Sequence, residues 1–229
     1  MHGVNDDDVL VRGVGLSKAY GGSTATVQAL RDVTVDVRPG TFTVITGPSG
    51  SGKTTLLHCL SGLATPDAGQ VLFAGADLTQ LDDSARSRQR RDAMGFVFQR
   101  DNLLPALTVR ENTALPLLLQ GVSRDELEQR VTDCLAAVGL AERSGAFPSQ
   151  LSGGQLQRAA VARALSSRPK VLWADEPTGA LDSAAAAEVM ALLRSLTPDG
   201  CAVVVVTHAA DLAEQADQVA VLRDGRRIA

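Results

Sequence analysis

The sequence has few of the features that mark a secreted or membrane-spanning chain. Its three cysteines, Cys59, Cys134 and Cys201, form neither a CxxC pair nor a Cys/His cluster with metal-ligand spacing. Its longest apolar runs, at residues 114–119 and 201–206, are well short of the roughly 18–20 residues that cross a bilayer. We therefore expect a chain that is neither exported nor membrane-spanning and that works in a reducing cytoplasm.

The sequence also lacks an excess of positive charge. The formal net charge is −4 and the pI about 5.4, so nothing in the overall charge favours nucleic acid, and we expect no nucleic-acid partner. The basic run at residues 86–91 is interpreted as a solvated surface. With 229 residues, 45% of them hydrophobic and 21% charged, the composition is that of a folded globular protein, and we expect one domain over residues 1–229. Three lysines against nineteen arginines suggest a bacterial source.

Several short segments have the composition of β-strands. Residues 9–16 and 33–37, separated by a turn at residues 21–23, predict an antiparallel layer near the N-terminus. Four almost wholly apolar runs predict strands buried on both faces of a parallel sheet, at residues 42–46, 171–174, 202–207 and 219–222.

Helical patterns lie between these runs. Ser123 and Glu126 have the spacing of a capping box ahead of an amphipathic helix that Gly139 ends. Residues 155–165 and 183–196 are rich in alanine and leucine and predict two further helices. The sequence thus predicts an α/β fold in which residues 100–160 form an inserted helical subdomain.

The first chemical motif is GPSGSGKT, which follows a predicted strand and precedes a helical stretch. Its glycines allow successive main-chain N–H groups to curl around phosphate oxygens at a helix N-terminus. Lys53 would reach the β and γ phosphates, and the Thr54 hydroxyl would coordinate Mg²⁺. The predicted nucleotide-binding residues are Gly47, Pro48, Ser49, Gly50, Ser51, Gly52, Lys53, Thr54 and Thr55.

The second motif is a pair of carboxylates, Asp175 and Glu176, at the end of the apolar run 171–174. Asp175 is placed to hold Mg²⁺, and Glu176 is placed to act as a general base toward an attacking water. The pair therefore predicts hydrolysis as well as binding. The alternative is that both carboxylates cap the helix that follows.

The third motif is LSGGQ, at the start of the helix predicted from residue 155. Ser152, Gly153, Gly154 and Gln155 can form an anion cradle from a hydroxyl and exposed amides at a helix N-terminus. Together with the first two motifs, this stretch resembles the ABC ATPase family. The resemblance implies an α/β P-loop NTPase (RecA-like) core with an N-terminal antiparallel β subdomain, and a head-to-tail homodimer whose Ser152 cradle closes on the ATP of a second subunit.

Four further positions match the family, and each has a structural alternative. Gln99 resembles the glutamine that joins the Mg²⁺ and water shell, although alone it reads as a surface glutamine. Asp182 resembles a residue that communicates across the dimer, and it is equally suited to cap the helix from Ser183. His208 resembles the histidine that contacts the γ-phosphate, and Tyr20 resembles the aromatic residue that stacks on adenine. Without the family, His208 and Tyr20 would be assigned to structure and packing.

The resemblance implies an ATPase, with ATP and Mg²⁺ bound, that powers a separate transmembrane permease subunit from the cytoplasmic face of the membrane. Within the family the stretches at residues 27–33, 95–117 and 174–183 look most like ATPases of lipoprotein release, macrolide export and cell division. The alternative function is the motor of a mechanotransmission or cell-division complex that moves no substrate. Leu103, Leu104 and Leu107 are candidates for docking the membrane partner, or else for subdomain core.

Overall fold

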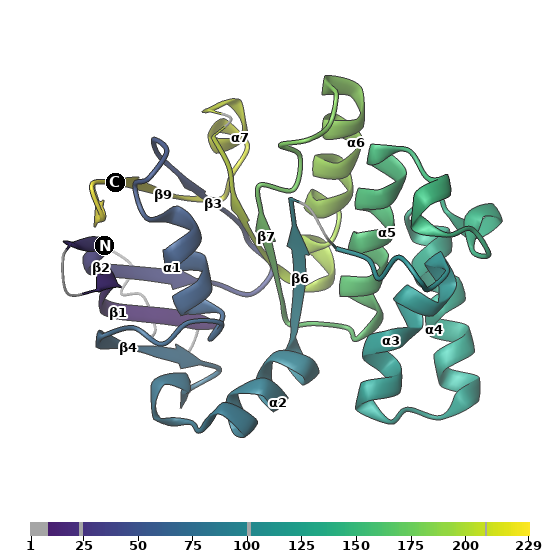
Figure 1. The fold of residues 1–229 in the computed structure, drawn as a ribbon, viewed down its shortest axis with the longest axis horizontal. Helices are drawn as coiled ribbons and strands as arrows, with labels where there is room; N and C mark the ends of the chain where they lie inside the picture. The colour runs from purple at the N-terminus through teal and green to yellow at the C-terminus, as the bar shows by residue number, and fades with distance from the viewer. Residues whose placement is uncertain (1–8, 23–24, 100–101, 209) are drawn as a thin grey trace.

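The computed structural model describes residues 9–22, 25–99, 102–208 and 210–229. A six-stranded sheet runs through the middle of the fold in the order β10-β9-β3-β8-β7-β6 (Figure 1). Five of its strands are parallel and the short β10 is antiparallel to β9. The strands are β3 (Phe42–Thr46), β6 (Met94–Phe98), β7 (Val171–Asp175), β8 (Ala202–Val206), β9 (Gln218–Arg223) and β10 (Arg226–Arg227).

The four predicted parallel strands are confirmed. β3, β7 and β8 are buried on both faces, as apolar runs without alternation indicate, whereas β9 alternates between buried and half-buried residues. The predicted antiparallel layer is also present, but its strands are longer than predicted. This second sheet has the order β2-β1-β4-β5 and consists of β1 (Val11–Gly22), β2 (Ala25–Val37), β4 (Ala68–Phe73) and β5 (Ala76–Asp77).

β1 continues past its predicted end because bulges interrupt the alternation of apolar and polar residues along it. The pairing of β1 with β2 shifts register between Gly13 and Leu16 and twice more before Ala19, so apolar and polar residues stop alternating there. The strand pattern in the sequence ends where the alternation ends, whereas the hydrogen-bonded ladder continues through a bulge. The turn predicted at residues 21–23 falls partly on residues outside the described ranges.

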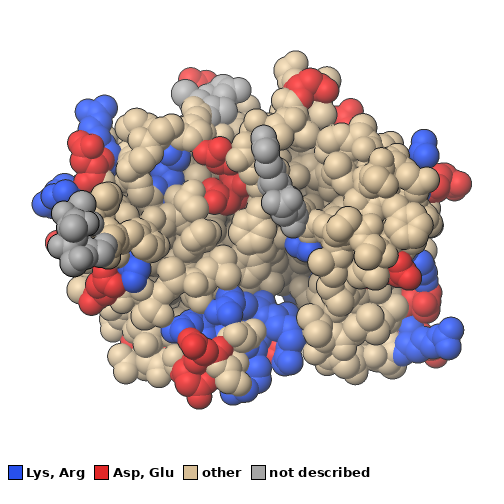
Figure 2. Space-filling view, viewed as in Figure 1, with Lys and Arg blue, Asp and Glu red and all other residues tan. Residues whose placement is uncertain are grey.

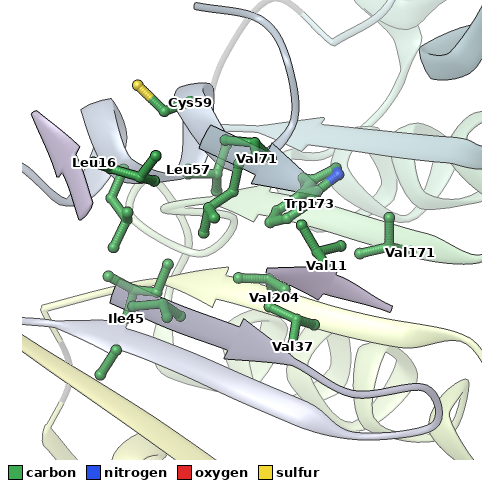
Figure 3. Packing of buried hydrophobic residues seen from close by; sticks show 14 of the residues in the cluster. Val11, Leu16, Val37, Ile45, Leu57, Cys59, Val71, Val171, Trp173 and Val204 are labelled. Carbon is green, nitrogen blue, oxygen red and sulfur yellow. The ribbon is translucent and has the colours of Figure 1, made fainter. Parts of the chain in front are cut away.

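A hydrophobic core fills the space between the two sheets (Figure 3). Val11, Leu16 and Val37 come from the antiparallel sheet, and Ile45 and Trp173 from the parallel sheet. Trp173 is fully buried there, and its indole nitrogen has no hydrogen-bond partner. Trp173, two residues before Asp175, is thus a core residue.

Seven α-helices complete the described part of the chain. They are α1 (Lys53–Leu60), α2 (Asp83–Ala93), α3 (Val109–Gln120), α4 (Arg124–Ala137), α5 (Gly153–Ser166), α6 (Ser183–Arg194) and α7 (Ala210–Glu214). The middle of α5 is buried on every side, since Ala159, Ala160, Val161 and Ala162 are all fully buried between the sheet and α3 and α4. No described helix has the length and apolarity that crossing a bilayer requires.

Two local predictions about helices need correction. The Ser123 hydroxyl accepts the Glu126 N–H, but the Glu126 carboxylate pairs with Arg130 on the next turn of α4 instead of completing the capping box. The basic run at 86–91 is only partly solvated, because the Arg90 guanidinium is half-buried and donates to the Gly62 carbonyl at 2.6 Å. In both cases an arginine guanidinium donates to a nearby acceptor, the Glu126 carboxylate in α4 and the Gly62 carbonyl beside α2.

Candidate nucleotide-binding site

The loop of residues 47–52 connects β3 to α1 at the carboxyl edge of the parallel sheet. One side of the loop packs against the main chain of β9 and β2. A Cβ on Gly47 would lie 2.1 Å from the Leu222 carbonyl oxygen, and a Cβ on Gly52 would lie 2.2 Å from the Ala29 carbonyl oxygen. A Cβ on Gly50, by contrast, would meet nothing within 4 Å. The loop is therefore closed behind and open in front, which is the shape of a cradle.

Lys53, the first residue of α1, is the cation of this cradle. It is only 5% exposed, and its ammonium group donates to the carbonyls of Gly47 at 3.0 Å and Pro48 at 2.9 Å. Burial lowers the pKa of Lys53, while the carboxylates of Glu176 and Asp175 oppose that change. The buried Ser51 hydroxyl has no hydrogen-bond partner. A bound anion would offset the cost of burying both groups.

The two predicted carboxylates lie at the end of β7. Asp175 accepts a hydrogen bond at 3.1 Å from the Thr54 hydroxyl, and burial raises the pKa of its carboxyl group. Glu176 has a φ of 47° and its N–H donates to the Val206 carbonyl. This uncommon conformation for a non-glycine residue turns the Glu176 side chain out of the strand, and its Oε1 lies 2.5 Å from Nε2 of His208.

These groups share one cleft of about 330 Å³. Its lining consists of Val27, Ala29, Ser49, Gly50, Gly52, Lys53, Thr54, Thr55, Glu176 and His208. The structure thus brings together the glycine-rich loop, one of the two predicted carboxylates and the predicted histidine. Val27 and Ala29, on β2, were not predicted; a valine and an alanine carry no chemical signature, so no sequence signal could have found them.

Two predicted residues lie beside the cleft. Gln99 directly follows Phe98, which pairs with Asp175 in the sheet. The Gln99 amide packs closely on Gly179, since a Cβ on Gly179 would lie 2.6 Å from the Gln99 amide nitrogen. Tyr20 is opposite Val27 in the pairing of β1 with β2 and is 46% exposed. The Lys18 ammonium lies 5.6 Å from the centre of the Tyr20 ring.

The Ser152 segment is in a different place. Ser152 caps α5, with its hydroxyl accepting the Gln155 N–H at 3.3 Å and the Gln155 amide oxygen accepting the Ser152 N–H at 3.0 Å. The glycines beside it contact the start of α6, where the Asp182 carboxylate caps the helix at 2.9 Å from the Ala185 nitrogen. The described lining of the Lys53 cleft includes none of them, and α1 and α5 lie in opposite halves of the fold (Figure 1).

The oxygen groups of Thr54 and Asp175 fit a hard divalent cation. Magnesium prefers oxygen ligands. The Thr54 hydroxyl and the Asp175 carboxylate, which lie within hydrogen-bond distance of each other, would supply two of them. The positive charge of such a cation would also favour the ionised form of Asp175, which burial disfavours.

Comparison with known proteins agrees with this site. The family model described as ABC transporter matches residues 30–179. A lipoprotein-releasing system ATP-binding protein, LolD 2 of Caulobacter vibrioides, is 45% identical and covers 92% of this chain and 93% of its own length. The macrolide export ATP-binding/permease protein MacB of Nitrosomonas europaea is 44% identical over 94% of this chain, which spans 33% of that relative's length. The resemblance to lipoprotein-release and macrolide-export ATPases is thus confirmed.

Solved structures give the same result. A dimeric structure of the ATP-binding cassette MJ0796, in a post-hydrolysis state bound to ADP and Pi, superposes with a TM-score of 0.88 at 39% identity. The match covers 96% of this chain and 97% of that one. The predicted α/β P-loop core with an antiparallel β layer and added helices is thereby confirmed, and the chain belongs to the ABC transporter family.

Proposed function

We propose that this chain binds and hydrolyses ATP and thereby powers a transmembrane partner. The observation that carries the proposal is the cleft in which a buried lysine, an open glycine loop and a carboxylate–histidine pair face the same space. ATP supplies the anion that the buried Lys53 and Ser51 lack. The relatives from lipoprotein release and macrolide export support a role in transport.

Each residue of the cleft has a chemical task in this proposal. The main-chain N–H groups of residues 49–52 and the Lys53 ammonium hold the phosphates, for which Lys53 exchanges its carbonyl partners. Thr54 and Asp175, with Gln99 nearby, would hold Mg²⁺, which when bound neutralises charge on the transferred phosphoryl group. Glu176 accepts a proton from the attacking water, and His208, 2.5 Å from the Glu176 carboxylate, orients it.

We further propose that two copies pair head to tail. In one chain the Ser152 cradle is remote from the Lys53 cleft, so a nucleotide held by Lys53 can contact only the Ser152 of another copy. Accepting the Gln155 N–H leaves the Ser152 hydroxyl hydrogen free to donate to a phosphate. Tyr20, exposed at the edge of the cleft, would stack on adenine, and Asp182 would lie close to the other copy.

The membrane partner is expected to dock in a groove of about 380 Å³ between the sheet and α3. Its lining includes the apolar residues Leu63, Phe96 and Leu119 and the arginines Arg90 and Arg91. Figure 2 shows basic side chains gathered at the lower edge of the molecule, over α2. A partner helix with apolar and acidic residues would complement this groove, and the partner would place the chain at the cytoplasmic face of the membrane.

The docking residues predicted from the sequence are less suitable. Leu103 packs partly buried against the core around α3, α4 and α5, and Leu107 is half-buried. Leu104 is 47% exposed and is the one of the three that offers an open apolar surface.

Two substitutions test the hydrolytic site. Lys53→Ala should weaken ATP binding by at least about tenfold, since it removes a charge-assisted hydrogen bond in a desolvated site. Glu176→Gln should retain ATP and stay dimeric in sizing chromatography, while turnover falls by about 10²–10⁴-fold. The exposed Lys170→Ala and Glu142→Gln are matched controls that should leave both properties unchanged. Normal turnover in Glu176→Gln would remove the proposed base.

A second function is a mechanical or cell-division motor that uses the same ATPase without moving a substrate. The two differ only in what the partner does, so the test is reconstitution of the chain with its membrane partner in vesicles. ATP-dependent accumulation or release of a substrate supports transport. ATP turnover that changes the partner's conformation without any flux supports the mechanical function.

A further inference from the structure

Two buried amide side chains meet at the end of strand β6. Asn102 is 7% exposed and Gln157 is 5% exposed, and their side chains lie 3.4 Å apart. Both bind the main chain of one residue, Phe98. The Phe98 N–H donates to Asn102 Oδ1 at 2.7 Å, and the Phe98 carbonyl accepts from Gln157 Nε2 at 2.9 Å and from Asn102 Nδ2.

This arrangement gives hydrogen-bond partners to main-chain groups of β6 that are not paired within the sheet. β6 is the outermost described strand of its sheet, and it pairs with β7 on one side. The main-chain groups of Phe98 therefore find their partners in the two amides. A buried amide that lacks a hydrogen-bond partner destabilises the fold, so the three residues favour one mutual arrangement.

Phe98 connects the strand end beside the Lys53 cleft to the helix that carries the Ser152 cradle. It immediately precedes Gln99, and it pairs in register with Asp175. Gln157 belongs to α5, the helix that Ser152 caps. The hydrogen bond from Gln157 to Phe98 thus joins the helix of the Ser152 cradle directly to the strand end that presents Gln99.

We propose that Asn102 and Gln157 are positioning residues that fix Gln99 relative to the Ser152 helix by holding the main chain of Phe98. The proposal rests on the proposed function, because it gives Gln99 a place in the Mg²⁺ and water shell. Gln157 and Asn102 touch no nucleotide themselves. They fix the position of the Gln99 amide when α5, the helix that Ser152 caps, binds a phosphate through its N-terminus.

The test is a double-mutant cycle between Gln157→Leu and Gln99→Ala, with ATPase turnover as the readout. Leucine keeps the volume of the side chain and removes the donor to Phe98. In the wild-type background we expect kcat to fall about tenfold, with KM for MgATP within about twofold, and the Mg²⁺ concentration for half-maximal activity to rise. In the Gln99→Ala background Gln157→Leu should lower kcat hardly further, since both changes affect the same group.

A purely structural role gives a different pattern. If Gln157→Leu lowers kcat by the same factor in both backgrounds, or leaves kcat unchanged, the proposal is overturned. The exposed Gln129→Leu on α4 is the matched control and should behave as wild type. If Gln157→Leu fails to fold, Gln157→Asn, one methylene shorter, withdraws the donor from Phe98 while keeping a polar amide, and it should give the same non-additive cycle.

The cycle also separates this proposal from the proposed function. Absence of ATPase activity in the wild-type chain with its partner, or activity that is indifferent to Lys53→Ala, would overturn the function. ATPase activity that depends on Lys53 and Glu176, together with an additive cycle for Gln99 and Gln157, overturns only the positioning role.

Discussion

Replacing Gly52 by alanine should destabilise the fold far more than the same replacement at Gly50, two residues earlier in one loop. Both glycines have a positive φ, 101° for Gly52 and 76° for Gly50. A Cβ on Gly52 would lie 2.2 Å from the Ala29 carbonyl oxygen, a separation that real Cβ atoms do not adopt, whereas a Cβ on Gly50 enters open space.

The magnitudes follow from these two differences. A left-handed conformation costs alanine about 1–2 kcal/mol, and the loss of unfolded-state freedom offsets about 0.4–1 kcal/mol of that cost. Gly50→Ala should therefore lower the free energy of unfolding by about 1 kcal/mol. Gly52→Ala adds a main-chain overlap that forces β2 and the loop apart, which costs about 1–3 kcal/mol more.

Urea denaturation followed by tryptophan fluorescence measures this difference. Trp173 is the single tryptophan and is fully buried, so its emission reports unfolding directly. With an m value of about 2 kcal/mol/M, the midpoint of Gly52→Ala should lie about 1 M below that of Gly50→Ala. Gly50→Ala should instead weaken ATP binding, because its methyl group enters the open side of the cradle. Equal midpoints for the two variants would refute the reasoning.

Three further changes test the electrostatics and the helix caps. Burial raises the pKa of Asp175, so the folded protein holds the carboxyl proton more tightly than the unfolded chain and loses stability as the pH rises above the unfolded pKa. Asp175→Asn should therefore raise Tm at neutral pH, and an unchanged or lower Tm would contradict this. The Phe42 N–H, and then Arg194, lower the pKa of Asp217, so Asp217→Asn should lower stability by about 1 kcal/mol at neutral pH, a loss that must shrink as the pH falls through the folded pKa. Thr108→Ala should cost about 1 kcal/mol in urea denaturation, since it removes the α3 cap, and an unchanged midpoint would argue against that cap.

Strong local patterns were predicted well from the sequence. The apolar run at 42–46 is strand β3 with the same bounds, because a strand buried on both faces needs no partner-dependent alternation. Asp182 caps α6 as predicted. The ends of β1 were missed because bulges displace its alternation, and such bulges depend on the neighbouring strand. The division into domains and the roles of the site residues remain predictions.

The sequence by itself determined the local motifs from which the site is built. A glycine loop with its lysine, and a carboxylate pair after a buried strand, are local patterns, since each motif folds within one strand–loop–helix unit. Only the tertiary structure decided which residues share a space. It placed Val27 in the Lys53 cleft, left Ser152 outside it, and brought Gln157 onto Phe98 across 59 residues. Such contacts arise from the packing of whole elements, and no spacing along the chain encodes them.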